Sequence, residues 1–180
     1  MKSPIRILIV DDHAMVRFAL SESIQRNSDM SLVGEAENGD EAVSLYRNLR
    51  PDVVTMDFKL PDRDGDQIIT EIRAEFPDAK VVLLSISENP ESIWRATEAG
   101  ALGYVSKAAE IEEVVTAIRH VACGKPFYSA GLAEKLDARR NQESLSHREA
   151  PPRKDLRETR SQRPHPGGNC GGAARPHPSG

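Results

Sequence analysis

The side chains best suited to chemistry follow short apolar runs of the sequence. Asp11 and Asp12 end the first run, and Asp57 ends the third. Ser85 ends the fourth run, and Lys107 follows the fifth. Three carboxylates within about 4–6 Å repel one another by about 1–4 kcal/mol per pair, a repulsion that a hard divalent cation reverses. The set therefore predicts a Mg²⁺ site with an amine and a hydroxyl beside it.

This combination favours phosphoryl chemistry. A tetrahedral anion next to the cation would have its charge neutralised by Lys107 and would accept a hydrogen bond from Ser85. One carboxylate could then attack phosphorus as a nucleophile. Asp57 is the candidate, because it ends a strand-like run and precedes the loop 58–65, which can offer a backbone carbonyl to the metal.

These side chains meet only if the apolar runs form a parallel sheet. The runs alternate with longer amphipathic stretches, and they span residues 5–10, 31–36, 53–56, 81–85 and 102–105. This alternation is typical of βα units, and in open parallel sheets ligands bind at the carboxyl ends of the strands. We predict an α/β fold with a doubly wound, five-stranded parallel sheet.

Helices are predicted between the runs from apolar stripes at helical spacing. Gly39-Asp40 begins the second helix and Asn89-Pro90 begins the fourth. The fifth has the clearest stripe and ends before Gly124 and Pro126; its apolar positions are Ile111, Val114, Val115, Ile118 and Ala122.

Four segments carry a family resemblance when they are taken together: ILIVDDH, MDFKLPDRDG, VVLLS and AGALGYVSK. In order and spacing they resemble the receiver domain of two-component response regulators, over about residues 5–125. The segments DDHAMVR and LVGEAENGDEAV are similar to the LuxR/NarL-type branch. The resemblance implies a (βα)5 flavodoxin-like fold and a phosphorelay function, in which a histidine kinase phosphorylates Asp57.

The resemblance also implies roles for individual residues. Mg²⁺ would be bound by Asp12, the Asp57 carboxylate and the Lys59 backbone carbonyl, with Asp11 contributing through metal-bound water. Lys107 would neutralise phosphoryl oxygens, Ser85 would hydrogen-bond one of them, and Tyr104 would be the switch aromatic. Core packing explains Tyr104 equally well.

The resemblance implies an output surface as well. It is the face made by the fourth helix, fifth strand and fifth helix, which would form a phosphorylation-dependent homodimer or dock a partner. The three histidines that we considered are interpreted as spectators, since none has a ligand partner at metal spacing: His13, His120 and His147.

The last forty residues have a different composition. Residues 141–180 contain few apolar side chains, and no Val, Ile, Met or aromatic residue. We predict a receiver domain over 1–125, a linker over 126–149 with room for a short helix at 129–140, and a low-complexity, disordered tail over 150–180.

The tail bears on DNA binding. Leu145–Glu149 is similar to the segment that opens the DNA-binding helices of this family, but Pro151-Pro152 then blocks a helix. We therefore expect the helix-turn-helix to be lost by truncation or a frameshift, with no specific DNA binding.

Charge and composition limit the other partners. The formal net charge is −4, with +3 in residues 141–180 and −7 before them. An acidic domain binds nucleic acid or anionic membranes poorly. We find no apolar run long enough for a membrane span and no signal peptide pattern, and the two cysteines lack metal or disulfide spacing, so we expect a cytoplasmic protein.

Two other function classes remain for comparison. A haloacid-dehalogenase-like phosphatase also uses a strand-end Asp and Mg²⁺, but it needs a second Asp two residues later, where this chain has Lys59. A phosphorylation-independent interaction module would not need the acid set. We expect a phosphoacceptor and not an enzyme.

Overall fold

The computed structural model describes residues 3–86, 89–129, 131 and 134, and in them strands and helices alternate as predicted. The strands are β1 Ile5–Val10, β2 Met30–Ala36, β3 Val53–Asp57, β4 Val81–Ser85, β5 Gly103–Ser106 and β6 Phe127–Tyr128. The helices are α1 Ala14–Gln25, α2 Gly39–Leu49, α3 Gly65–Glu75, α4 Pro90–Ala99 and α5 Ile111–Ala122.

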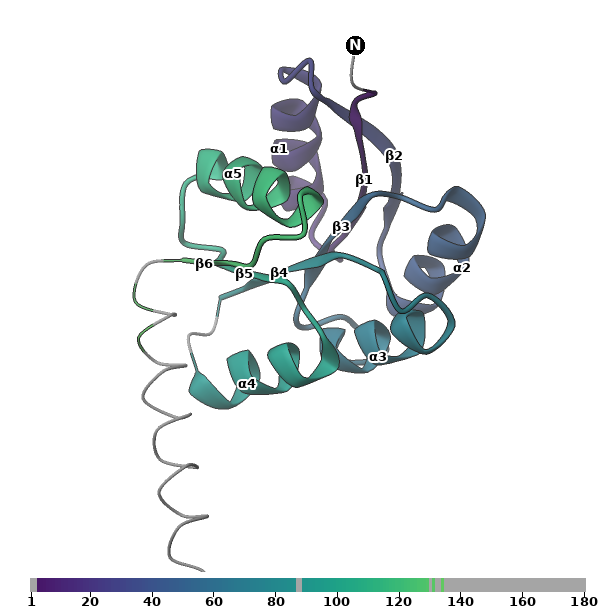
Figure 1. Ribbon diagram of the computed structural model, residues 1–180, viewed down its shortest axis with the longest axis vertical. Coiled ribbons are helices and arrows are strands. Elements are labelled where there is room, and N and C mark those ends of the chain that lie inside the picture. Colours follow the sequence, from purple (N-terminus) through teal and green to yellow (C-terminus); the bar gives the residue numbers. More distant parts are fainter. Residues whose placement is uncertain (1–2, 87–88, 130, 132–133, 135–180) are drawn as a thin grey trace, which may run out of the picture.

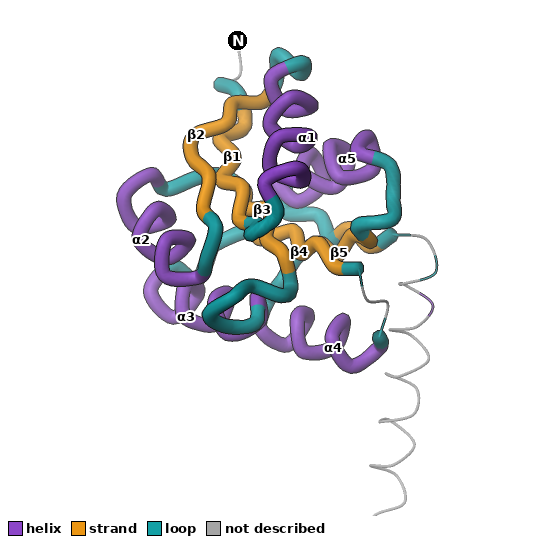
Figure 2. The backbone as a smooth tube through the Cα atoms, turned by 180° about the vertical axis from the view of Figure 1, so that it is seen from behind, coloured by secondary structure: helices purple, strands orange, loops and turns teal. Residues whose placement is uncertain are grey.

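The strands form one parallel sheet in the order β2-β1-β3-β4-β5-β6. Helices α1 and α5 cover one face, and α2, α3 and α4 cover the other (Figure 1). Figure 2 shows the sheet between these two layers from behind. The predicted doubly wound α/β fold is confirmed.

The strand count of five needs a correction. Within the described residues β6 adds a sixth strand, which pairs with β5 through Gly103 and Tyr104. It is two residues long and directly follows Pro126, so it has no apolar periodicity that a sequence pattern could detect. The sheet thus continues past residue 125, where we placed the end of the receiver domain.

The apolar runs form strands because both faces of the sheet are covered. All residues of β3, β4 and β5 are buried. Successive side chains along a strand point to opposite faces of the sheet and so enter two separate cores. Val54 and Met56 pack under α2, α3 and α4, whereas Ile7 and Val53 pack under α1 and α5.

Helices α2 and α4 begin at the predicted positions, Gly39 and Pro90. The Asn38 side chain accepts a hydrogen bond from the Glu41 N–H and caps α2, and Asn89 caps α4 in the same way through Glu91. Gly100 ends α4 in the left-handed region at φ 97°, a conformation that favours glycine.

The strand order leaves room for a binding site at the carboxyl ends of β1 and β3. Chain connections leave β1 toward β2 on one side and later return to β3 on the other. The loops after β1 and β3 therefore diverge, and such switch points are where open α/β sheets bind ligands.

Some predictions fall outside the described residues. They are the predictions for the Leu145–Glu149 segment, for a disordered tail over 150–180 and for almost all of a short helix at 129–140. In the described part of the chain, no helix has the length and apolar character needed to cross a membrane.

Candidate functional site

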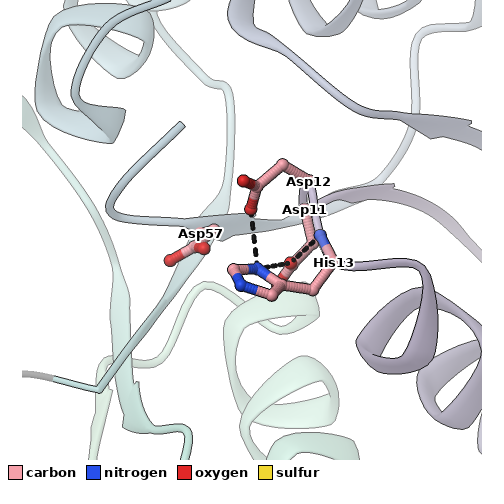
Figure 3. A group of neighbouring side chains, drawn as sticks. All are labelled: Asp11, Asp12, His13 and Asp57. Atoms are coloured by element: carbon pink, nitrogen blue, oxygen red, sulfur yellow. Dashed lines mark hydrogen bonds and ion pairs between the residues drawn. The ribbon is translucent and has the colours of Figure 1, made fainter. Parts of the chain in front are cut away.

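The carboxyl ends of β1 and β3 bring the three predicted acids together. Val10 pairs with Met56 in the sheet, so the residues that follow them, Asp11 and Asp57, lie side by side. Both are buried, whereas the Asp12 side chain is 37% exposed. Ligand atoms of the acids and of the adjacent His13 all lie within 4.8 Å of one another. Figure 3 shows these side chains converging from the two strand ends.

Lys107 reaches the same cluster from the end of β5. Its Nζ lies 2.6 Å from Asp57 Oδ2 and 2.7 Å from Asp11 Oδ2. Its backbone N–H donates to the carbonyl of Ser85 at 2.8 Å, which fixes the start of this loop against β4. One ammonium group therefore serves two buried carboxylates.

The electrostatics of this cluster follow from burial. Burial raises the pKa of Asp57, and the hydrogen bond and positive charge of Lys107 offset only part of that rise. Burial lowers the pKa of the Lys107 amine, but the adjacent Asp11 and Asp57 outweigh it and hold that pKa above its usual value. With three acids against one ammonium group, the cluster suits a cation as a further partner.

His13 belongs to the cluster, which corrects its interpretation as a spectator. Its Nδ1 lies 2.7 Å from Asp12 Oδ1 and 3.2 Å from Asp11 Oδ1, and its N–H donates to Asp11 Oδ1 at 2.9 Å (Figure 3). The sequence did hold a signal, because His13 directly follows the acid pair at the same strand end.

Lys59 lies at the rim of the site. Its N–H donates to Asp57 Oδ1 at 3.3 Å, while its exposed ammonium pairs with Asp64 at 2.8 Å. Its loop is closed by a 2.7 Å hydrogen bond from the Gly65 N–H to the carbonyl of Phe58. The loop that starts at the phosphoacceptor candidate is thus held in one shape.

The same loop is fastened to α2. The Asp62 carboxylate accepts hydrogen bonds from the N–H groups of Gly39 and Asp40, at 2.9 and 3.1 Å. Arg63 bridges Asp40 and Glu71. Asp62 caps a helix 23 residues earlier in the chain, and the sequence pattern did not reveal this role.

Ser85 and Tyr104 occupy different environments. Ser85 is buried at the end of β4 and lines the cleft above Asp57. Tyr104 is 1% exposed and belongs to the core under α2, α3 and α4. The core-packing interpretation of Tyr104 is therefore confirmed, and its ring lies inward in this structure.

A cleft of about 290 Å³ opens over the cluster. Its lining combines the acids with the loop after β3 and the end of β4: Asp12, His13, Asp57, Lys59, Leu60, Pro61, Ser85 and Ile86. The space is large enough for a hydrated cation and a tetrahedral anion, and the Asp57 carboxylate in its wall is paired with the Lys107 ammonium group.

Comparison with protein families decides what this arrangement is. Residues 7–119 match the family described as "Response regulator receiver domain", and this segment contains every residue of the cluster. The chain belongs to the response regulator receiver family.

Curated relatives of this receiver domain are response regulators of the LuxR/NarL type. The chain is 37% identical to the response regulator GacA of Pseudomonas aeruginosa over 132 aligned residues. The alignment covers 73% of this chain and 62% of GacA. It is 35% identical over 135 residues to the transcriptional regulatory protein LiaR of Bacillus subtilis, covering 75% of this chain and 64% of LiaR. The receiver chain thus spans less than two thirds of the length of these relatives.

Solved structures agree with this assignment. A LuxR-family two-component response regulator from Aurantimonas sp. aligns with a TM-score of 0.73 and 34% identity, covering 77% of this chain and 99% of that structure. The fold and the family together identify a response regulator receiver domain.

Proposed function

We propose that this receiver domain accepts a phosphoryl group on Asp57 from a histidine kinase in the presence of Mg²⁺. The observation that carries the proposal is the environment of the Asp57 carboxylate. One oxygen is paired with Lys107 at 2.6 Å, and the carboxylate lines the cleft together with Asp12. A nucleophile, a charge-neutralising amine and clustered acids that suit a cation would thus act together at the ends of β1, β3 and β5.

The donor set fits Mg²⁺. This ion prefers carboxylate and carbonyl oxygens and keeps several waters, and the cluster offers clustered carboxylates at an open cleft. Asp12, the Asp57 carboxylate and the Lys59 carbonyl would hold the ion, with Asp11 acting through a water. When bound, the ion neutralises charge on the phosphoryl oxygens.

Each residue of the site would then have its own role in phosphoryl transfer. An Asp57 oxygen forms the new bond to phosphorus while the bond from phosphorus to the kinase histidine nitrogen breaks. Lys107 already lies at Asp57 and transfers its hydrogen bonds to the phosphoryl oxygens. The Ser85 hydroxyl donates to one of them, and Tyr104 packs behind it.

The enzyme alternative is not favoured. A phosphatase of the haloacid-dehalogenase type needs an acid where this chain places Lys59, whose ammonium group pairs with Asp64. We propose a phosphoacceptor that loses its phosphoryl group slowly, with no turnover of phosphate esters.

The kinase docking surface is proposed on α1. Met15 and Phe18 are large apolar side chains that are 78% and 63% exposed. Phe18 lines a groove of about 900 Å³ between α1 and α5, and Met15 shares a smaller pocket with Lys107. Lys107, which lines the smaller pocket and pairs with Asp57, links this surface to the proposed phosphoacceptor. Phe18→Ser should slow phosphotransfer from a kinase without changing labelling by a small phosphodonor.

The output surface is proposed on α4, β5 and α5. Ser85 ends β4 directly before the segment that leads to α4, and Tyr104 lies in β5, so the two proposed switch residues belong to this face or adjoin it. We propose that phosphorylation drives a homodimer or docks a partner there. A phosphoryl mimic that leaves oligomeric state and amide exchange over residues 89–120 unchanged would argue against it.

Sequence-specific DNA binding is not proposed for residues 150–180. The grounds are Pro151-Pro152 and the lack of an apolar stripe for a recognition helix. The basic residues there would give weak, salt-sensitive contacts with phosphates. A sequence-selective complex in a mobility-shift assay with competitor DNA would contradict this view.

The central test is intact mass after incubation with a small phosphodonor and Mg²⁺. We expect one phosphoryl group on the wild type and none on Asp57→Asn or without Mg²⁺. Asp78→Asn, which changes an exposed acid after α3, is the matched control and should label normally. Equal labelling of Asp57→Asn would disprove the assignment.

A further inference from the structure

The imidazole of His13 has a position that Mg²⁺ binding does not require. Its Nδ1 faces Asp12 Oδ1 at 2.7 Å and Asp11 Oδ1 at 3.2 Å, although the ring is 59% exposed. Figure 3 shows the ring beside the Asp12 and Asp57 carboxylates. The two carboxylate contacts hold this half-exposed ring at the cluster, so its nitrogen lies within reach of an ion bound by the same acids.

The backbone holds this ring near the acids. The His13 N–H donates to Asp11 Oδ1, and its carbonyl accepts the N–H groups of Val16 and Arg17 in the first turn of α1. Arg17 Nη1 in turn donates to the Asp11 carbonyl at 2.8 Å. The segment is therefore anchored on both sides of the histidine.

The spacing of the donor atoms suits one metal ion. Ligands about 2.1 Å from an octahedral ion lie about 3 Å apart when adjacent and about 4.2 Å apart when opposite. The four donor atoms of Asp11, Asp12, His13 and Asp57 lie within 4.8 Å of one another. Small side-chain rotations bring such a set around a single ion.

The type of donor selects the metal. Carboxylates and carbonyls suit Mg²⁺, whereas imidazole nitrogen suits Zn²⁺, Cu²⁺ and Ni²⁺, and affinity for a mixed nitrogen and oxygen site rises along the series from Mn²⁺ to Cu²⁺. In a pocket with carboxylates alone, the affinities for Mg²⁺ and for these ions would differ less. A nitrogen donor enlarges the difference in favour of the transition metals.

We propose that His13 Nδ1, with Asp12 and Asp57, makes the acid pocket a site for divalent transition metals of the Zn²⁺ class, which compete there with Mg²⁺. The inference rests on the proposed function in taking these two acids as cation ligands, and it adds a nitrogen ligand and a class of metal. In this mode the neutral ring carries its proton on Nε2, and His13 Nδ1 and Asp12 Oδ1 bind the ion instead of each other.

The test is an NMR titration of the full chain, at one fixed pH, with Zn²⁺ or with Mg²⁺. Imidazole ¹⁵N spectra report each histidine separately, so the histidines beyond residue 134 do not confuse the result. We expect a coordination shift of His13 Nδ1 with Zn²⁺ and none with Mg²⁺. That shift should be absent in Asp57→Asn.

The same titrations give the affinities for Zn²⁺ and Mg²⁺ from the shifts of the backbone amides of residues 11–13 and 57–59. His13→Gln should weaken Zn²⁺ binding at least tenfold and change Mg²⁺ affinity less than twofold. His120→Gln, whose ring packs edge-on against Phe127, should change neither affinity. The inference is overturned if Zn²⁺ leaves His13 Nδ1 unshifted, or if His13→Gln weakens both metals equally. Mg²⁺ binding and Asp57 labelling are measured separately, so either can succeed while this inference fails.

Discussion

Lys107 Nζ lies 2.6 Å from Asp57 Oδ2, and this contact joins two residues that are 50 positions apart. The same amine lies 2.7 Å from Asp11 Oδ2, so it ties the ends of β1, β3 and β5 together. In this structure it compensates the negative charge of the two buried carboxylates, and in the proposed phosphorylated state it would compensate the phosphoryl oxygens.

Replacing Lys107 should destabilise the metal-free protein strongly. Lys107→Ala leaves Asp11 and Asp57 buried without their cation, and breaking such a pair costs about 3 kcal/mol. Mg²⁺ should restore part of this loss, because it supplies positive charge to the same carboxylates. Urea unfolding with and without Mg²⁺ measures both effects. Lys59→Ala is the control, since its ion pair with Asp64 is exposed on the Lys59 side and is worth about 1 kcal/mol or less. Equal losses for the two variants would contradict the argument.

Thr55→Val should leave the protein as stable or make it more stable. The Thr55 Oγ1 is fully buried in β3 and has no hydrogen-bond partner among the described residues. Valine has nearly the same shape and removes the desolvation cost of the hydroxyl, so we expect a gain of about 1 kcal/mol. Thermal unfolding checks this, with the exposed Thr70→Val as a control that should stay within about 0.5 kcal/mol. A loss above 1 kcal/mol would point to an unseen partner for the hydroxyl.

Removal of the Asp62 carboxylate should destabilise α2 and the loop after β3. Asp62→Ala deletes the acceptor for the Gly39 and Asp40 N–H groups, a loss of about 1 kcal/mol for a helix cap. Asp62→Asn keeps one acceptor oxygen and should lose less. Chemical denaturation at pH 7 compares the variants, and identical stability of Asp62→Ala and wild type would refute the capping role.

The contribution of Asp62 should also depend on pH. Burial would raise the pKa of Asp62, but hydrogen bonds from the Gly39 and Asp40 N–H groups outweigh it and hold that pKa below its usual value. Because the folded pKa is lowered, the stabilisation is present above the unfolded value of about 3.9 and is lost as the pH falls through the folded pKa. The stability difference between wild type and Asp62→Ala should therefore shrink below about pH 4. A difference that grows on acidification would show the opposite sign.

Gly65→Ala should disturb the site through the backbone. A Cβ at Gly65 would lie 2.8 Å from the Asp57 carbonyl oxygen and 3.0 Å from Leu83 Cδ2. Because the nearest atom belongs to the backbone of β3, the loop must shift, at a cost of about 1–3 kcal/mol. We expect lower stability and weaker Mg²⁺ binding, measured by calorimetry. Gln67→Ala, an exposed position in the same helix, should affect neither. Normal Mg²⁺ affinity in Gly65→Ala would mean that the loop position does not matter for the ion.

The strand-end acids were predictable because their positions depend on local pattern. An apolar run followed by Asp11-Asp12 or by Asp57 indicates a covered strand that ends in polar groups, and parallel strands bring such ends to one edge. The same reasoning located Ser85 and the Lys107 loop. Helix bounds were predictable for a similar reason, since Asn38 and Asn89 act on N–H groups two or three residues away.

Tertiary structure alone decided the contacts between distant segments. The sequence placed Lys107 near the acids, but not its direct ion pairs with both Asp11 and Asp57. These pairs, the capping of α2 by Asp62 and the sixth strand at Phe127–Tyr128 depend on how the chain returns to the sheet, which no spacing along the sequence encodes. His13 combines a feature set by the local sequence with one set by the folded structure. Its place after the acid pair is local, but the direction of its ring is set in the folded structure by the contacts of Nδ1 with the Asp11 and Asp12 carboxylates. Local patterns determine which elements form and what each presents at its end, whereas the energy of packing those elements decides which ends meet.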